Sequence, residues 1–270
     1  MGRIIKFEMK KMLLRLGVII PWILVALLST ILLNTAGNDV VEIYSSVFDK
    51  SYGIAPLIGL LTFTIVSGSY TKEYDNNMVG LINSTENGKK NIVKAKAIAA
   101  GISVSIVNLS IVLIIYLSAL RKTGGKGLEL PLKSLWYFGN SGSSIKVYQM
   151  MIIMILTIII GSFIFAQIGL FLSSISKSAV IPFIFGGLIM GIPYLLEGFL
   201  IRAGNNGSIL PYTPLWGMYS CQIVRYKASM GMALGTLAII FVIVMTVLSK
   251  ASNKAFSCLL YTSPSPRDTR

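Results

Sequence analysis

The stretch MMIIMILTIIIGSFIFAQIGLFL, residues 150–172, contains no charged side chain over 23 residues. A helix that crosses a bilayer needs about 20 mainly apolar residues, because each residue advances ~1.5 Å and the hydrocarbon core is ~30 Å thick. The stretch therefore predicts a membrane-spanning helix, and the remainder of the chain contains more runs of the same kind.

The composition is that of a membrane protein, since only 13% of the 270 residues are charged, against roughly 25% in soluble domains. Apolar runs predict six spans, at residues 16–33, 54–70, 97–120, 150–172, 179–201 and 230–248. The second run is short, and we expect Pro193 to break the fifth. A helix satisfies its own backbone hydrogen bonds in lipid, and no barrel-like alternation is present. The predicted class is an all-α polytopic membrane protein with six transmembrane helices.

The basic residues predict the orientation. With both termini inside, thirteen Lys and Arg side chains fall on the inner side and nine on the outer side, and inner loops normally carry the excess. We therefore predict an N-in/C-in topology, although the outer loop 121–149 is basic. The first 17 residues are basic and partly amphipathic, and we expect them to lie at the inner membrane surface, uncleaved. The net charge of +14 then indicates contact with anionic lipid rather than with nucleic acid.

The C-terminal stretch CLLYTSPSPRD, residues 258–268, resembles a translated sequencing adapter. The alternative interpretation is a genuine Ser- and Pro-rich disordered tail. We expect residues 1–257 to form the membrane domain and residues 258–270 to be a non-native tail. Cys221 is then the single authentic cysteine, and an internal disulfide cannot form.

Side chains for catalysis and metal binding are scarce. Histidine is absent and the phosphate-binding pattern G-x-x-x-x-G-K-[ST] does not occur. We therefore predict no catalytic, metal or cofactor site. Glu197 is the sole carboxylate within a predicted span. It is either an interfacial residue within reach of Arg202 or a polar contact in a substrate path or outer gate.

Two further patterns have ordinary structural interpretations. Small residues recur in GGLIMG, residues 186–191, and in GMALG, residues 231–235, which favours close helix packing within the chain over a dimer contact. The aromatic stretches SLWYFGN, residues 134–140, and LPYTPLWGMY, residues 210–219, predict anchoring at the outer interface.

The polar stretch TKEYDNNMVGLINSTENGKKNIVKAK, residues 71–96, separates the second predicted span from the third. Its apolar positions have helical spacing and are Tyr74, Met78, Val79, Leu81 and Ile82. Turn-forming residues follow, and then a basic segment. The pattern predicts a short amphipathic helix and a turn, for which an interfacial anchor is sufficient explanation.

This loop resembles the cytoplasmic loop after the second span of type 2 ATP-binding-cassette (ABC) exporter permeases. The matching positions are Glu73, Tyr74, Asp75, Ser84, Lys89, Ala95 and Lys96. Asn77 and Met78 depart from a usual Gly-Thr, and Glu86 replaces a usual proline. The stretch GLFLSSISKSAV, residues 169–180, is similar to the short cytoplasmic turn between later spans in that family.

The resemblance implies that residues 1–257 are a permease subunit of an exporter in a bacterial plasma membrane. Such a subunit is not itself an enzyme. It pairs with a second permease subunit and is energised by a separate cytoplasmic P-loop ATPase, which binds the ATP. The loop would then contain a coupling helix, and the implied ATPase-coupling residues are Glu73, Tyr74, Asp75, Met78, Leu81, Lys89 and Lys96. An ATP-independent protein, either a secondary transporter or an immunity or structural membrane protein, stays open as the alternative.

Overall fold

The computed structural model describes residues 1–35, 37–71, 73, 88–139, 141–176, 178–202 and 209–261. It is 83% helical, and the described part contains no strand beyond one isolated bridge between Pro131 and Lys146. The all-α class is therefore confirmed. The α-helices are α1 (Gly2–Leu13), α2 (Leu16–Asn34), α3 (Val40–Gly53), α4 (Ala55–Val66), α7 (Gly88–Thr123), α8 (Val147–Ile175), α9 (Val180–Arg202), α10 (Pro214–Met218), α11 (Cys221–Arg225), α12 (Met230–Ile243) and α13 (Ser249–Tyr261).

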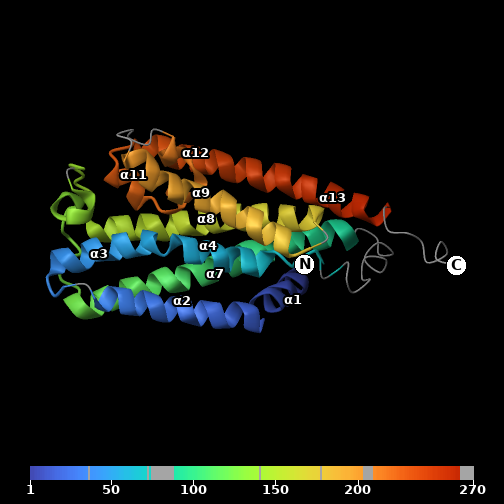
Figure 1. Ribbon diagram of the computed structural model, residues 1–270, viewed down its shortest axis with the longest axis horizontal. Coiled ribbons are helices and arrows are strands. Elements are labelled where there is room, and N and C mark those ends of the chain that lie inside the picture. Colours follow the sequence, from blue (N-terminus) through green and yellow to red (C-terminus); the bar gives the residue numbers. More distant parts are fainter. Residues whose placement is uncertain are drawn as a thin grey trace.

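Within the described residues, five helices are long and apolar enough to cross a membrane. They are α2, α7, α8, α9 and the segment Met230–Ala255, which comprises α12, a π-helical turn and the start of α13. The predicted second span corresponds to α4, whose 12 residues reach only about 18 Å. The helix α3 leads into α4 along the bundle (Figure 1), separated from it by Ile54 alone. A multi-pass membrane protein is thus supported, whereas six spans remain a prediction.

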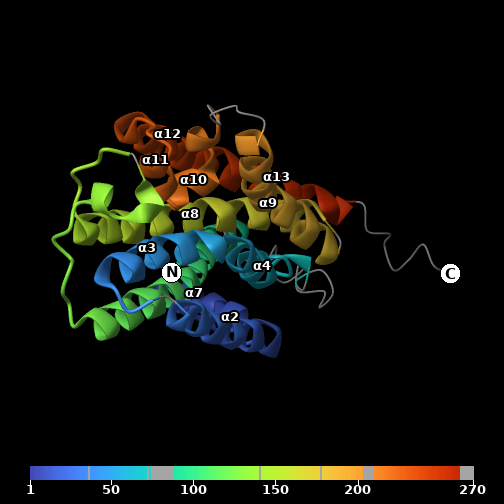
Figure 2. The same cartoon turned by 60° about the vertical axis from the view of Figure 1, so that its left-hand side comes forward.

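The helices α7 and α8 form the centre of the bundle, and α2 lies on one side of them with α9 and α12 on the other (Figures 1 and 2). Burial follows this order, since 61% of the most apolar window of α7 and 56% of that of α8 are buried, against 22% for α2 and α9. The outer helices expose apolar faces, as expected where lipid is the solvent.

The bundle has two ends, which we call proximal and distal. The proximal end holds α1, the start of α7 and the end of α13, and the distal end holds the ends of α2 and α7 and the loop that follows α7 (Figure 1). The predicted junction at Cys258 falls inside α13, and residues 262–270 lie outside the described part. The tail assignment therefore stays a prediction.

Pro193 does not break α9, which is continuous from Val180 to Arg202. That expectation was wrong. A proline removes one backbone donor from the helix, but membrane helices tolerate it because local adjustments and neighbouring groups satisfy the freed carbonyl. Pro21 lies inside α2 in the same way.

The glycines divide into two groups. An added Cβ at Gly186 would lie 2.2 Å from the Phe63 ring, so the prediction of packing within the chain is confirmed there. At Gly187 and Gly191 nothing lies within 4 Å of such an atom, and the same holds for Gly231 and Gly235. Packing within this chain therefore does not explain those four positions.

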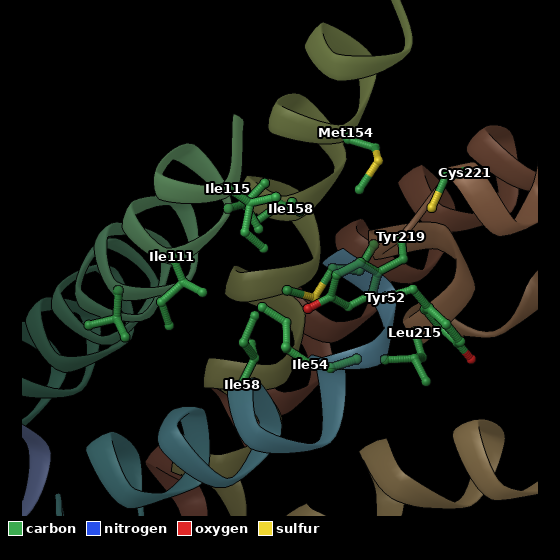
Figure 3. Close-up of a cluster of buried hydrophobic side chains, with 14 of the residues drawn as sticks. Tyr52, Ile54, Ile58, Ile111, Ile115, Met154, Ile158, Leu215, Tyr219 and Cys221 are labelled. Carbon is green, nitrogen blue, oxygen red and sulfur yellow. The ribbon is translucent and has the colours of Figure 1, made fainter. Parts of the chain in front are cut away.

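The aromatic stretches mostly form a core at the distal end instead of an interfacial belt. Tyr137, Phe138, Trp216 and Tyr219 are buried. Phe138 packs edge-on against Phe48 with ring centroids 5.1 Å apart. Figure 3 shows Tyr52 and Tyr219 side by side in the same core, with Leu215, Met154 and Cys221 around them. Trp136 and Tyr212 are exposed, and for these two residues anchoring at an interface stays a prediction.

Candidate functional site

The first part of the site is α1, which the sequence forms as a basic amphipathic helix. Lys10 and Lys11 lie in its last turn, where cations are favoured by the helix dipole. Glu8 and Met12 are its buried residues and share one face because they are four positions apart. Arg3, Lys6 and Lys10 are exposed, so α1 turns its single carboxylate inward.

The second part is Lys96, in the third turn of α7 beyond the loop. Its side chain is fully buried, and its Nζ donates to Glu8 Oε2 at 2.8 Å, to the Ser69 carbonyl at 3.0 Å and to Glu73 Oε1 at 3.1 Å. An ammonium group has three protons to donate, and these three acceptors use all of them. The Tyr70 ring adds a cation–π contact, with its centroid 5.7 Å from Nζ.

The third part is Glu73, just before the part of the loop that lies outside the described residues. It also accepts a hydrogen bond from Lys11 of α1. Burial alone would raise the pKa of Glu73, but the Lys96 and Lys11 ammonium groups hold it below its usual value. Glu73 is therefore ionised at neutral pH.

We call Glu8, Lys11, Glu73 and Lys96 the proximal ion cluster. It joins three segments that are remote in sequence: α1, the residues after α4 and the start of α7. Losing one partner of a buried ion pair leaves an uncompensated charge and typically costs ~3–5 kcal/mol. The cluster therefore resists any motion that separates these segments.

Sequence reasoning found part of this cluster. It singled out Glu73 and Lys96, and the structure brings these two side chains together. It missed Glu8, which lies in the N-terminal segment that we expected to rest at the inner membrane surface. A signal was present, because Glu8 is the single acidic residue among the first 38 positions of a strongly basic segment.

The other predicted coupling residues cannot be placed. Tyr74, Asp75, Met78 and Leu81 lie outside the described residues, and Lys89 belongs to α7 but its side chain is not described. The amphipathic helix of the loop therefore stays a prediction. The second predicted turn is observed, since α8 ends at Ile175 and α9 begins at Val180.

A second polar cluster surrounds Glu197 at the distal end. This side chain is buried and accepts hydrogen bonds from Tyr226 Oη at 3.0 Å and from Gln222 Nε2 at 3.5 Å. The Tyr226 ring stacks on Trp216 at 4.9 Å, and the Arg225 guanidinium lies 5.4 Å from the Tyr226 ring centroid. Hydrogen bonds to a carboxylate are stronger than neutral ones, so the cluster fastens α9 to α11 and the residue after it.

The two sequence interpretations of Glu197, an interfacial residue near Arg202 and a contact in a substrate path or outer gate, both stay predictions. The side chain of Arg202 is not described, and no ion pair of Glu197 occurs among the described residues. Glu197 is instead a buried contact between α9 and α11. Nearby, Tyr219 Oη, Trp216 Nε1 and Gln222 Oε1 are buried and have no hydrogen-bond partner among the described residues, and a buried polar atom in that state is costly.

Within the part of the chain that the structure describes, no group of three His, Cys, Asp or Glu side chains could hold a metal ion. Comparisons with protein-family models, with curated proteins and with solved structures found no match for this chain.

Proposed function

We propose that this chain is the permease subunit of an ABC exporter in a bacterial plasma membrane. In this proposal a separate cytoplasmic ATPase binds the loop between α4 and α7, and the loop transmits the ATP-driven movement of that partner to the membrane helices. The resemblance of residues 71–96 to the family's coupling loop is the starting point. The proximal ion cluster is the observation that supports it.

The cluster gives the loop a mechanical connection. The loop begins after Glu73 and ends at the start of α7. Glu73 accepts a hydrogen bond from Lys96, which lies on α7 itself. Lys96 is also bonded to Glu8 of α1, and α1 leads directly into α2. A force applied to the loop therefore reaches α1, α7 and the end of α4 together.

This arrangement assigns Glu73 a different task from a surface contact. Its carboxylate is engaged inside the protein by Lys11 and Lys96, so its charge is not offered to a partner. Asp75 is the acidic residue of the motif that we propose contacts the ATPase. The partner can shift the permease between conformations only by binding one of them more tightly than the other.

The proposal also includes a second permease subunit. An apolar groove of about 320 Å³ lies between α4 and α9 and is lined in part by Pro56, Gly59, Gly187 and Gly191. Open glycines let a second helix approach closely in a membrane. The open space at Gly187 and Gly191 of α9 therefore favours a helix contact with another subunit there.

The test is co-expression of the chain with a P-loop ATPase encoded beside it. We expect the ATPase to co-purify with the wild-type chain and to be lost on Asp75→Lys. The matched control is Asp39→Lys, which makes the same charge reversal at an exposed position of the distal end. Retention of the ATPase by Asp75→Lys, or absence of any ATPase from the wild-type preparation, contradicts the proposal and favours the ATP-independent alternative.

A further inference from the structure

The helices α2 and α7 lie side by side (Figure 1). Side-chain hydrogen bonds join them at two levels. Deep in the bundle, Trp22 Nε1 donates to Ser110 Oγ at 2.8 Å. At the distal end, Lys122 Nζ donates to the carbonyls of Leu33 at 3.0 Å and of Asn34 at 3.2 Å, which closes the end of α2. The hydrogen bonds at these two levels fix the distance between the two helices.

A groove of about 480 Å³ lies between these two levels of hydrogen bonding. It is lined by Thr30, Ile114, Leu117, Ser118, Leu120 and Arg121. The lining residues of α7 run from Ile114 to Arg121, over which a helix rises about 10 Å. One leaflet of the hydrocarbon core is ~15 Å deep, so the groove can hold the upper part of one acyl chain in a single leaflet.

The groove has an apolar wall and a basic rim. Ile114 and Leu117 lie one turn below Ser118 and Arg121 on the same stripe of α7, because side chains three or four positions apart are neighbours on a helix. Arg121 is exposed, and among the described residues no carboxylate forms an ion pair with it. Its five donors are therefore available to an anion.

We propose that this groove binds one anionic phospholipid. The phosphate lies against the Arg121 guanidinium and the Ser118 hydroxyl, and one acyl chain follows Ile114 and Leu117 towards Trp22. Guanidinium groups bind phosphate through paired, charge-assisted hydrogen bonds, and basic pockets between membrane helices suit anionic head groups. A soluble phosphate would leave the apolar wall unused, which is why the ligand is a lipid.

This site accounts for a feature that the ATPase proposal leaves unexplained. Arg121 belongs to the stretch 121–149, which is basic although the predicted topology places it outside, where Lys and Arg are normally fewer. A lipid head group held at the rim gives one of these charges, that of Arg121, a partner. The inference does not depend on the ATPase, because it uses only α2, α7 and the bilayer.

The experiment is native mass spectrometry of the purified full chain after exchange into phosphatidylglycerol or phosphatidylcholine. We expect one phosphatidylglycerol to be retained per chain in preference to phosphatidylcholine. Arg121→Gln should weaken this retention about fivefold, whereas Arg121→Lys should keep most of it. Lys126→Gln removes an equal charge from the same end but outside the groove, and should retain the lipid as the wild type does.

Two further arms make the outcome decisive. Ser118→Phe fills the groove and should abolish retention of the lipid, with an unchanged thermal midpoint showing that the fold is intact. Glycerol phosphate, which has the head group without acyl chains, should not displace the bound lipid. Equal retention of the two lipids by the wild type, or equal loss from Arg121→Gln and Lys126→Gln, overturns the proposal.

Discussion

Lys96 and Glu8 are 88 residues apart in sequence, yet Lys96 Nζ lies 2.8 Å from Glu8 Oε2 in the buried proximal end of the bundle. The N-terminal helix is therefore packed into the protein through an ion pair and does more than rest on a membrane surface. Because Glu73 shares the same ammonium group, any change at Lys96 acts on the N-terminus and on the loop at once.

The first prediction concerns this shared charge. Lys96→Met removes the cation and leaves two buried carboxylates near each other, so the free energy of unfolding should fall by about 3–5 kcal/mol. Denaturation in mixed detergent micelles measures this loss. Lys94→Met is the matched control, since Lys94 is exposed on the same helix two positions away. A similar loss of stability in both variants would show that the effect comes from replacing any lysine of this helix by methionine and not from the proximal ion cluster.

The second prediction is a pH dependence with a definite sign. The pKa of Glu73 is held below its usual value by Lys96 and Lys11 against the effect of burial. A carboxyl group with a lowered folded-state pKa adds stability above its unfolded-state pKa, which is about 4.3, and loses it as the pH falls further. The thermal midpoint should therefore be level from pH 7 to about pH 5 and fall below about pH 4. Glu73→Gln should reduce this fall, and an unchanged acid transition in that variant would exclude Glu73 as its source.

Long apolar runs carried most of the fold prediction. The run at residues 16–33 became α2 (Leu16–Asn34), and the run at 150–172 lies inside α8 (Val147–Ile175). Such runs need no tertiary information, because lipid requires a helix wherever the chain crosses it. The second run was less informative, since α4 has only 12 residues and its continuation, α3, is more polar.

The candidate site was less accessible to sequence reasoning. Composition places Lys96 at a membrane end, where an exposed lysine is the ordinary expectation. Its burial depends on Glu8 and Glu73 arriving from two other segments, and spacing along the chain does not encode that meeting. The buried aromatic residues Tyr137 and Trp216 were misassigned for the same reason. Clustered aromatic residues are typical of membrane interfaces and also of a buried core at the end of a helix bundle. Only the fold distinguishes the two.

The third prediction tests the topology. With an N-in orientation, the loop at 121–149 is outside and the loop at 74–87 is inside. An impermeant thiol reagent applied to intact cells should therefore label Ser134→Cys and spare Ser84→Cys. Burial raises the pKa of the Cys221 thiol to about 12, so the native cysteine should give little background. The reverse labelling pattern would invert the topology and remove the basis of the permease proposal.

The fourth prediction concerns Glu197. Tyr226→Phe removes the shorter of its two hydrogen bonds while keeping the ring that stacks on Trp216. A hydrogen bond to a charged group contributes about 1.5–3 kcal/mol, so the free energy of unfolding should fall by that amount. Tyr212→Phe removes a hydroxyl from an exposed position and should change little. If Tyr226→Phe alters transport without altering stability, Glu197 belongs to a gate and not to a structural fastening.

The last prediction separates docking from transmission in the proposed coupling loop. Asp75 is proposed to contact the ATPase, whereas Met78 and Leu81 belong to the apolar stripe that would seat the helix on the membrane domain. Asp75→Lys should therefore reduce ATPase co-purification. Met78→Ala with Leu81→Ala should keep the ATPase bound but lower transport per ATP hydrolysed, because the helix no longer presses on the bundle.

The measurement is ATP turnover and substrate movement in the same proteoliposomes. Asn77→Ala is the control, since it truncates a side chain of the same segment that lies outside the apolar stripe. If ATP hydrolysis is uncoupled from transport in the double variant alone, this supports the transmission of movement from Met78 and Leu81 to Glu73 and Lys96. If the double variant transports with wild-type efficiency, the loop is an interfacial anchor, and the proximal ion cluster serves stability without transmitting force.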